Sequence, residues 1–104
     1  MDDKAYRAAA EVAKQAAGQA RREARELEEH RAALARHALV WWQGGAAERY
    51  QQLVQERVNA LTQLSTQLDD LALRADRLAE AFLAEAHLHT TITAVNAAHP
   101  VVLR

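Results

Sequence analysis

The chain has no cysteine, one proline and three glycines among its 104 residues. Without cysteine it can form no disulfide, no thiolate metal site and no cysteine nucleophile. So few prolines and glycines leave few places to turn, whereas a β-rich fold needs many such breakers. The residues that dominate the sequence are instead good helix formers. We therefore expect an all-α protein with a single domain over residues 1–104.

An excess of one charge and a long apolar run are also missing. The formal net charge is −1 at pH 7, and acidic and basic residues are interspersed. This pattern argues against nucleic acid and anionic membranes as main partners. No run of about 20 apolar residues is present, so no membrane insertion is expected. The N-terminus has no basic segment followed by an apolar run, so we expect no cleavable signal peptide.

Apolar residues recur every seven positions through the first half of the chain. One series reads Tyr6, Ala13, Ala20, Leu27, Leu34 and Trp41, and the series four residues later reads Ala10, Ala17, Ala24, Arg31 and Ala38. A seven-residue repeat sustained over this length is typical of a helix in a coiled coil or bundle. It predicts a helix over about residues 3–42.

Arg31 interrupts this repeat, where an aliphatic residue is expected. One interpretation is that its stem packs in the seam while the guanidinium reaches water. Another is an ion pair that sets the register of the two helices, with an acid on the second helix or on a partner. Glu56 is then the nearest acid on the second helix.

The second half of the chain predicts a helix over about residues 46–90. Its apolar series reads Ala47, Val54, Leu61, Leu68, Ala75 and Phe82, accompanied three residues later by Tyr50, Leu64, Leu71 and Leu78. Val58, Ala72, Ala79 and Ala86 lie beside this line, so the stripe is wide, and a wide stripe indicates burial against more than one helix. Threonines and Pro100 then weaken the helical signal, which predicts a frayed tail over residues 91–104.

The composition of the two stripes indicates a larger assembly. At about 25 cal/mol per Å² of buried apolar surface, a hairpin lined mostly by alanine gains little to offset its ordering entropy. We therefore expect an antiparallel helical hairpin that dimerises into a four-helix bundle. The expected hairpin and dimer interface consists of Leu27, Leu34, Tyr50, Val54, Leu61, Leu64, Leu68, Leu71, Leu78 and Phe82.

The turn between the two helices is predicted at residues 43–45. Gly44 can end the first helix, and Gly45 is an acceptable N-cap for the second. Trp41 lies on the first helix's seam and is expected to pack there. Trp42 lies beside the seam, where a large aromatic ring next to a turn is a candidate anchor for a partner.

Trp42-Gln43-Gly44, at the midpoint of two long helices, resembles the motif of the WxG family of small helical-hairpin proteins exported by type VII (Esx-type) secretion systems. Ala46, Ala47 and Tyr50 match the family's habit of small residues and then an aromatic after the motif, and the likeness covers about residues 5–88. The resemblance implies a homodimer or heterodimer with another hairpin, exported without a cleavable signal through a membrane-bound secretion ATPase. It implies Trp42, Gly44 and the neighbouring Trp41 as the recognition site.

The sequence departs from the family's C-terminal export signal, Tyr-x-x-x-Asp/Glu. The late aromatic is Phe82, with Ala86 four residues later and Glu85 one position early. The chain is then expected to supply Trp42 while a partner supplies the signal, or to escort a larger effector or toxin. The alternative is an intracellular adaptor or chaperone that shields another protein's hydrophobic helices in the cytoplasm.

Catalytic and metal chemistry find little support in the sequence. His30 and His37 could share a helix face, but metal sites usually need three or four convergent ligands. Acidic pairs such as Asp69 and Asp70 lie on a hairpin that offers no cleft to perturb their pKa values. Gly44-Gly45 follows a helix without a nearby lysine, which is no phosphate loop. We expect no enzyme activity, no metal and no cofactor.

Overall fold

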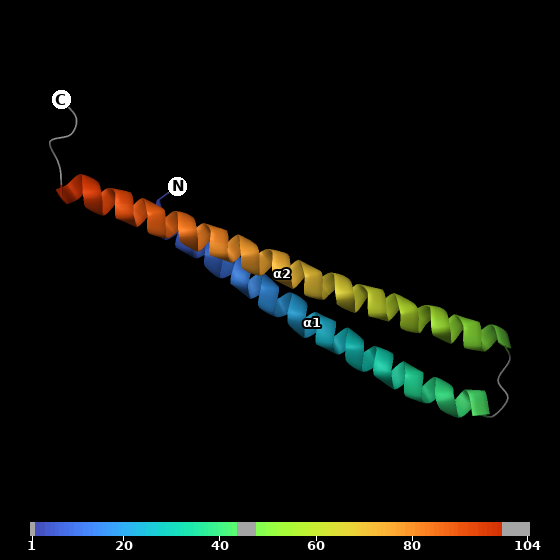
Figure 1. Cartoon of the computed structure of the whole chain (residues 1–104). Helices are drawn as coiled ribbons and strands as arrows, with labels where there is room; N and C mark the ends of the chain where they lie inside the picture. The colour runs from blue at the N-terminus through green and yellow to red at the C-terminus, as the bar shows by residue number, and fades with distance from the viewer. Residues whose placement is uncertain (1, 44–47, 99–104) are drawn as a thin grey trace. The chain divides into compact units, whose positions relative to one another are not determined.

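Two long helices make up the described chain. The computed structural model describes residues 2–43 and 48–98, and the side chains of residues 2–39 and 48–97. Helix α1 spans Asp3–Gln43 and helix α2 spans Glu48–Ala98. They pack against each other as a hairpin and run in opposite directions (Figure 1). The predicted all-α helical hairpin is confirmed.

Helix α1 begins where the sequence predicts, at a capping aspartate. The backbone N–H of Ala5 donates to the Asp2 carboxylate at 2.8 Å, and the N–H of Tyr6 donates to the Asp2 carbonyl at 3.1 Å. These bonds satisfy amide groups that a helix N-terminus leaves without intrahelical partners. Asp3 adds a negative charge in the first turn, which the helix dipole favours.

Contacts between residues divide the predicted single domain into two units. Unit 1 consists of Met1–Ala17 and Leu73–Arg104, and unit 2 is the continuous segment Gly18–Ala72. In unit 1 the start of α1 lies along the end of α2, and in unit 2 the end of α1 lies along the start of α2 (Figure 1). Each unit therefore contains one stretch of each helix.

The buried side chains are nearly all alanine. On α1 the spacing between them alternates between three and four residues from Ala10 to Ala24, as the seven-residue repeat predicts, and Ala38 follows two repeats later. On α2 Val54 joins the alanines. The buried set is Ala10, Ala13, Ala17, Ala20, Ala24, Ala38, Val54, Ala72, Ala79 and Ala86. Small side chains let two helix backbones approach closely, but they bury little apolar area. We call this set, with the half-buried residues between its members, the inner seam.

Unit 1 adds two aromatic rings to its alanines. Ala10, Ala13 and Ala79 form a buried cluster, and Phe82 and Leu83 pack against it. The rings of Tyr6 and Phe82 lie 6.3 Å apart between centroids, tilted by 37°. The Thr90 hydroxyl donates to Asp3 at 3.2 Å and so joins α2 to the first turn of α1.

In unit 2 a hydrogen bond joins the two helices at Ser65, a residue nearly as small as the buried alanines. The Ser65 hydroxyl, half-buried on α2, donates to the Ala24 carbonyl of α1 at 3.2 Å. A serine side chain is short, so this bond to a helix backbone requires the two helices to lie close together at this point. Ser65 is therefore part of the inner seam.

The inner seam of α2 differs from the line that the sequence indicates. Leu64, Leu71 and Leu78, expected to complete the seam, are 48%, 55% and 50% exposed. The residues that follow each of them, Ser65, Ala72 and Ala79, face α1 instead. Close approach to the alanines of α1 favours small side chains at these positions of α2, whereas the first predicted series does contribute Val54, Leu61, Leu68 and Phe82 to the inner seam.

The end of α2 also differs from the prediction. The helix continues to Ala98, so the frayed tail expected from residue 91 is wrong up to that point, and residues 99–104 lie outside the described ranges. The hydroxyls of Thr90 and Thr91 donate to the carbonyls of Ala86 and His87, each at 2.9 Å. These bonds to the preceding turn accommodate threonines within a helix.

A candidate protein-interaction face

The turn motif, which carries the sequence resemblance, cannot be assessed from the described atoms. The backbones of Trp41, Trp42 and Gln43 form the last turn of α1. The two tryptophan side chains lie outside the described residues, and so does Gly44. The assignment of Trp41 to packing and of Trp42 and Gly44 to recognition stays a prediction. The candidate site is therefore built from the apolar residues that α2 leaves exposed.

Two series of exposed residues, several of them large and apolar, follow α2 at seven-residue spacing. The first row takes every seventh residue: Tyr50, Arg57, Leu64, Leu71, Leu78, Glu85 and Ile92. The second row stands three residues after each member of the first: Leu53, Ala60, Gln67, Arg74, Ala81, Leu88 and Val95. Every member of both rows is exposed. We call these the first and second outer rows.

The leucines of the first outer row lie on a different side of α2 from the inner seam. Leu71 and Leu78 immediately precede the buried Ala72 and Ala79, and one residue turns an α-helix by about 100°. A helix with one neighbour needs one apolar stripe, and a second stripe at about a right angle is typical of a helix in a four-helix bundle. These exposed leucines therefore lie on a side of α2 that α1 does not cover.

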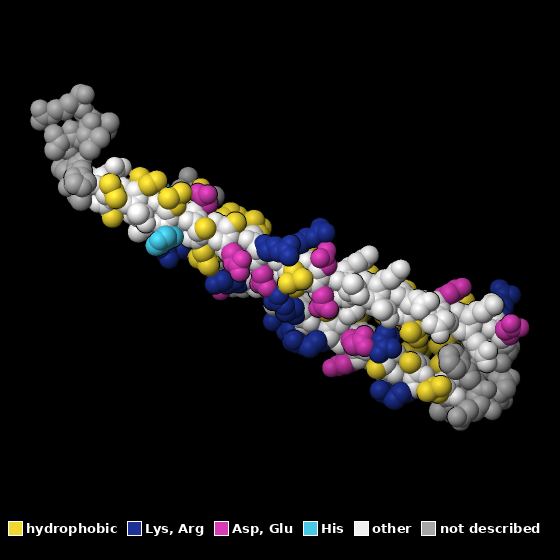
Figure 2. Space-filling view, in the orientation of Figure 1, with side chains coloured by type: hydrophobic (Ala, Val, Ile, Leu, Met, Phe, Trp, Pro, Cys, Tyr) yellow, Lys and Arg dark blue, Asp and Glu magenta, His cyan; other side chains and the backbone are white. Residues whose placement is uncertain are grey.

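Unit 1 carries the C-terminal members of the outer rows. Leu78, Leu88, Ile92 and Val95 are each about half exposed. Hydrophobic side chains are visible along the C-terminal part of α2, at the upper left of Figure 2. Scattered exposed apolar residues are normal on proteins, but a continuous apolar patch marks an interaction site. Leu88, Ile92 and Val95 are spaced four and three residues apart and so share one side of the helix.

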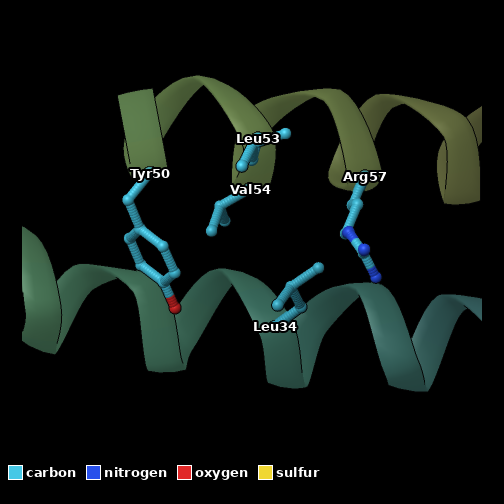
Figure 3. A pocket seen from close by; sticks show the side chains of 5 residues that line it. All are labelled: Leu34, Tyr50, Leu53, Val54 and Arg57. Atoms are coloured by element: carbon cyan, nitrogen blue, oxygen red, sulfur yellow. The ribbon is translucent and has the colours of Figure 1, made fainter. Parts of the chain in front are cut away.

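In unit 2 the outer rows border a hollow between the helices. It has a volume of about 260 Å³ and is lined by Leu34, Tyr50, Leu53, Val54 and Arg57. Tyr50, Val54 and Arg57 point from α2 toward α1, and Leu34 points back from α1 (Figure 3). A second hollow of about 230 Å³ is lined by Leu34, Arg57, Ala60 and Leu61. The apolar side chains of unit 2 thus leave space that a partner's side chains could fill.

The remaining interface residues of the sequence prediction are distributed over both surfaces. Val54 is buried, and Leu27, Leu34, Leu61, Leu68 and Phe82 are half-buried in the inner seam. Tyr50, Leu64, Leu71 and Leu78 belong to the first outer row. Sequence reasoning missed Ile92 and Val95, because both stood in the supposed tail. The seven-residue repeat, extended beyond residue 90, would have found them.

Arg31 forms its ion pair within its own helix, α1. Its guanidinium donates to the Glu28 carboxylate, with 2.6 Å between Nη2 and Oε1 and 2.9 Å between Nε and Oε1. The hydrogen bond from Arg31 lowers the pKa of Glu28, and the same bond raises the pKa of Arg31. The expected partner on α2, Glu56, is therefore wrong, because an acid one turn earlier is closer.

Charge on the rest of the surface is mixed. Lys and Arg side chains alternate with Asp and Glu side chains over the face in Figure 2. Within residues 2–43 and 48–98, no group of three or more His, Asp or Glu side chains is placed to hold a metal ion. Over the same ranges, neither helix combines the length and the apolar character needed to cross a membrane.

Comparison with known proteins adds no assignment. No family model, no curated protein and no solved structure matches the chain. Function must therefore be argued from the residues and their geometry.

Proposed function

We propose that this protein is a non-enzymatic, Esx-like helical hairpin that dimerises and takes part in type VII secretion, as an exported substrate or as the escort of a co-secreted partner. The observation that carries the proposal is that α2 has small buried residues on one side and large exposed apolar residues on another. The helix turns small residues toward α1 and leaves Leu64, Leu71, Leu78 and the rest of the outer rows exposed. Binding of another helical hairpin would cover these rows.

Energetic considerations favour such an assembly. Burying one leucine side chain is worth about 1.5–3 kcal/mol relative to leaving it exposed. An alanine buries far less, so the inner seam uses little of the chain's hydrophobic potential. A partner helix on the outer rows would bury several leucines at once, and the dimer would be a four-helix bundle.

The link to secretion rests on the turn. Trp42-Gln43-Gly44 supports this link by its resemblance to the WxG motif near the midpoint of the sequence, and its first two residues end α1. The family's C-terminal export signal is missing around Phe82, so the partner supplies Tyr-x-x-x-Asp/Glu in this proposal. The protein is then made in the cytoplasm and exported in a complex, with the secretion ATPase or a larger effector as a further partner.

The test is export from a host that has a type VII system. Wild-type protein, Trp42→Ala and the matched tip variant Gln43→Ala are expressed at equal levels, and culture supernatants are compared by quantitative immunoblotting. We expect Trp42→Ala to lose export while its helicity and its dimerisation are retained, and Gln43→Ala to behave as wild type. Equal export of all three variants, or no export of wild type even with candidate hairpin partners, would contradict the proposal.

The absence of the C-terminal signal also favours a second candidate, an intracellular adaptor or chaperone. Such a protein would use the outer rows to shield the hydrophobic helices of a larger effector. It predicts protein that stays in the cytosol whichever partner is expressed, together with an effector that aggregates when the adaptor is missing.

A further inference from the structure

We propose that the groove between α1 and α2 within unit 2 binds an amphipathic carboxylate, a molecule of the medium-chain fatty acid class. The carboxylate lies at the guanidinium of Arg57, and the alkyl chain lies on Leu34, Leu53 and Val54. The inference goes beyond the proposed function, because it concerns a small ligand and depends neither on a partner hairpin nor on export.

The groove consists of the two hollows of unit 2, which share Leu34 and Arg57 among their lining residues. Their volumes are about 260 Å³ and about 230 Å³. All the lining residues belong to the segment Gly18–Ala72, so the groove lies within one unit. Ligand pockets usually measure about 300–1,000 Å³, and hollows near the lower end of this range suit a small molecule.

The first hollow is framed by two long side chains of α2 (Figure 3). Tyr50 and Arg57 extend toward α1 on either side of Leu34, which points back from α1, and Val54 lies between them. Val54 is buried and Leu34 is half-buried, so the space between the frame residues is apolar. Leu53 adds a further apolar surface to its lining. Such a space accepts an alkyl chain.

Arg57 supplies the charge that selects the ligand. Among the described residues that line the two hollows, it alone is charged. Its side chain makes no ion pair or hydrogen bond within residues 2–43 and 48–98. A guanidinium presents its N–H donors in a planar fork that matches a carboxylate. One cation matches the single negative charge of a carboxylate better than the charge of about −2 on a phosphate monoester.

The spacing along α2 indicates the length of the alkyl chain. Tyr50 and Arg57 are seven residues apart, which corresponds to about 10 Å along the helix axis. A chain of about eight carbons, with bonds of about 1.5 Å, has a similar length. With its carboxylate at Arg57, octanoate would therefore reach the ring of Tyr50 with its methyl end.

Titration with three eight-carbon probes tests the class of ligand. Octanoate, 1-octanol and octylamine share the alkyl chain and differ in the charge of the headgroup. We expect calorimetry of the full chain, below the concentrations at which the probes form micelles, to show saturable binding of octanoate. Binding of 1-octanol should be at least about tenfold weaker, and octylamine should not bind. Equal affinities for octanoate and 1-octanol, or no saturable binding of octanoate, would overturn the proposal.

A matched pair of arginine variants tests the role of Arg57. Arg49 is also an exposed arginine of α2, but it lines neither hollow. We expect Arg57→Gln to bind octanoate at least about tenfold more weakly than wild type, because a neutral amide replaces the charged donor. Arg49→Gln should bind as wild type does. Unchanged affinity in Arg57→Gln would show that this residue does not hold the carboxylate.

A second pair of variants tests the place of the alkyl chain. Leu53 and Leu73 are 50% and 51% exposed, but Leu73 lines neither hollow. An aspartate at position 53 stands four residues before Arg57, where it can pair with the guanidinium and repel a carboxylate. We expect Leu53→Asp to abolish octanoate binding and Leu73→Asp to retain it, with circular dichroism showing that both variants are helical.

Methyl NMR of the wild-type chain distinguishes the groove from the other apolar surface. Octanoate should shift the methyl signals of Leu34 and Val54 and leave those of Leu88 and Ile92, exposed in unit 1, unchanged. Shifts that are as large at Leu88 and Ile92 would mean that the probe adsorbs to exposed apolar residues in general, and would overturn the site.

Discussion

α1 and α2 present the same kind of surface to each other and different surfaces to solvent. Toward the inner seam both offer alanine, at three- and four-residue spacing on α1 and at seven-residue spacing on α2. On their outer sides, the exposed large apolar residues of α1 within the described range are Val12 and Leu39, whereas α2 carries two apolar rows. The comparison teaches that the inner seam favours close approach of the helices, and that exposed apolar surface is concentrated on α2, where we propose that a partner binds.

Replacing a buried alanine of the inner seam with a larger residue should have the largest effect on stability, and it tests whether the seam requires small side chains. Ala17 is fully buried, whereas its neighbour Ala16 is exposed. Ala17→Leu forces a large side chain between close helices and should lower the free energy of unfolding by about 1–3 kcal/mol. Ala16→Leu should change it by less than about 0.5 kcal/mol. Urea denaturation at fixed protein concentration measures both, and equal effects would show that the seam tolerates bulk.

In unit 1 the contact between the helices includes an aromatic pair, Tyr6 and Phe82, besides the buried alanines. A double-mutant cycle tests this pair. Tyr6→Ala, Phe82→Ala and the double variant isolate the interaction between the rings. Tilted rings at 6.3 Å should give a coupling of about 1 kcal/mol beyond their separate losses. Additive effects of the two single changes would instead mean that each ring packs only against alanines.

The hydrogen bond between Ser65 and Ala24 should have a smaller effect. Ser65→Ala removes a half-buried bond and should cost roughly 0.5 kcal/mol, the lower end for a neutral bond. Thr66→Ala is the matched control, because the Thr66 hydroxyl bonds to the Thr62 carbonyl of its own helix. It should be neutral or slightly stabilising, since alanine is the better helix former. A larger loss at position 66 than at position 65 would contradict the close approach of the helices.

The smallest expected effect concerns the exposed side of α1. Because Arg31 lowers the pKa of Glu28, the pair favours the folded state above the ordinary pKa of a glutamate, and this contribution is lost as the pH falls through the lowered pKa. We expect NMR titration to show the pKa of Glu28 rising toward its ordinary value in Arg31→Gln. Arg36→Gln should leave it unchanged. An unaltered Glu28 titration in Arg31→Gln would show that the bond does not persist in solution.

The sequence predicted what depends on the repeat itself. The helix type, the start of α1 near Asp3 and the alanine line from Ala10 to Ala38 follow from a seven-residue period that either helix maintains alone. The inner line of α2 could not be predicted in the same way, because leucines and alanines compete for it. Which of the two residue types faces α1 depends on the distance between the helices, and the sequence of α2 alone does not determine that distance.

Two further differences have local causes. The end of α2 was placed too early, because helix propensity penalises Thr90 and Thr91 without counting their bonds to the preceding turn. The partner of Arg31 was sought across the hairpin although Glu28 was three residues away. Of the candidate site, the leucines were identified as interface residues, but the distinction between inner and outer rows required the structure.

The small size of the side chains in the inner seam also has a consequence for thermal unfolding. The heat capacity change of unfolding and the denaturant dependence of stability both scale with the surface that unfolding exposes, and apolar surface raises the heat capacity change. A chain that buries mainly alanines between two helices and leaves many of its leucines exposed uncovers little new apolar surface when it unfolds. Its melting as a single copy should therefore be broad, with a small heat capacity change for its length. Covering the outer rows would sharpen the transition as well as raise its midpoint.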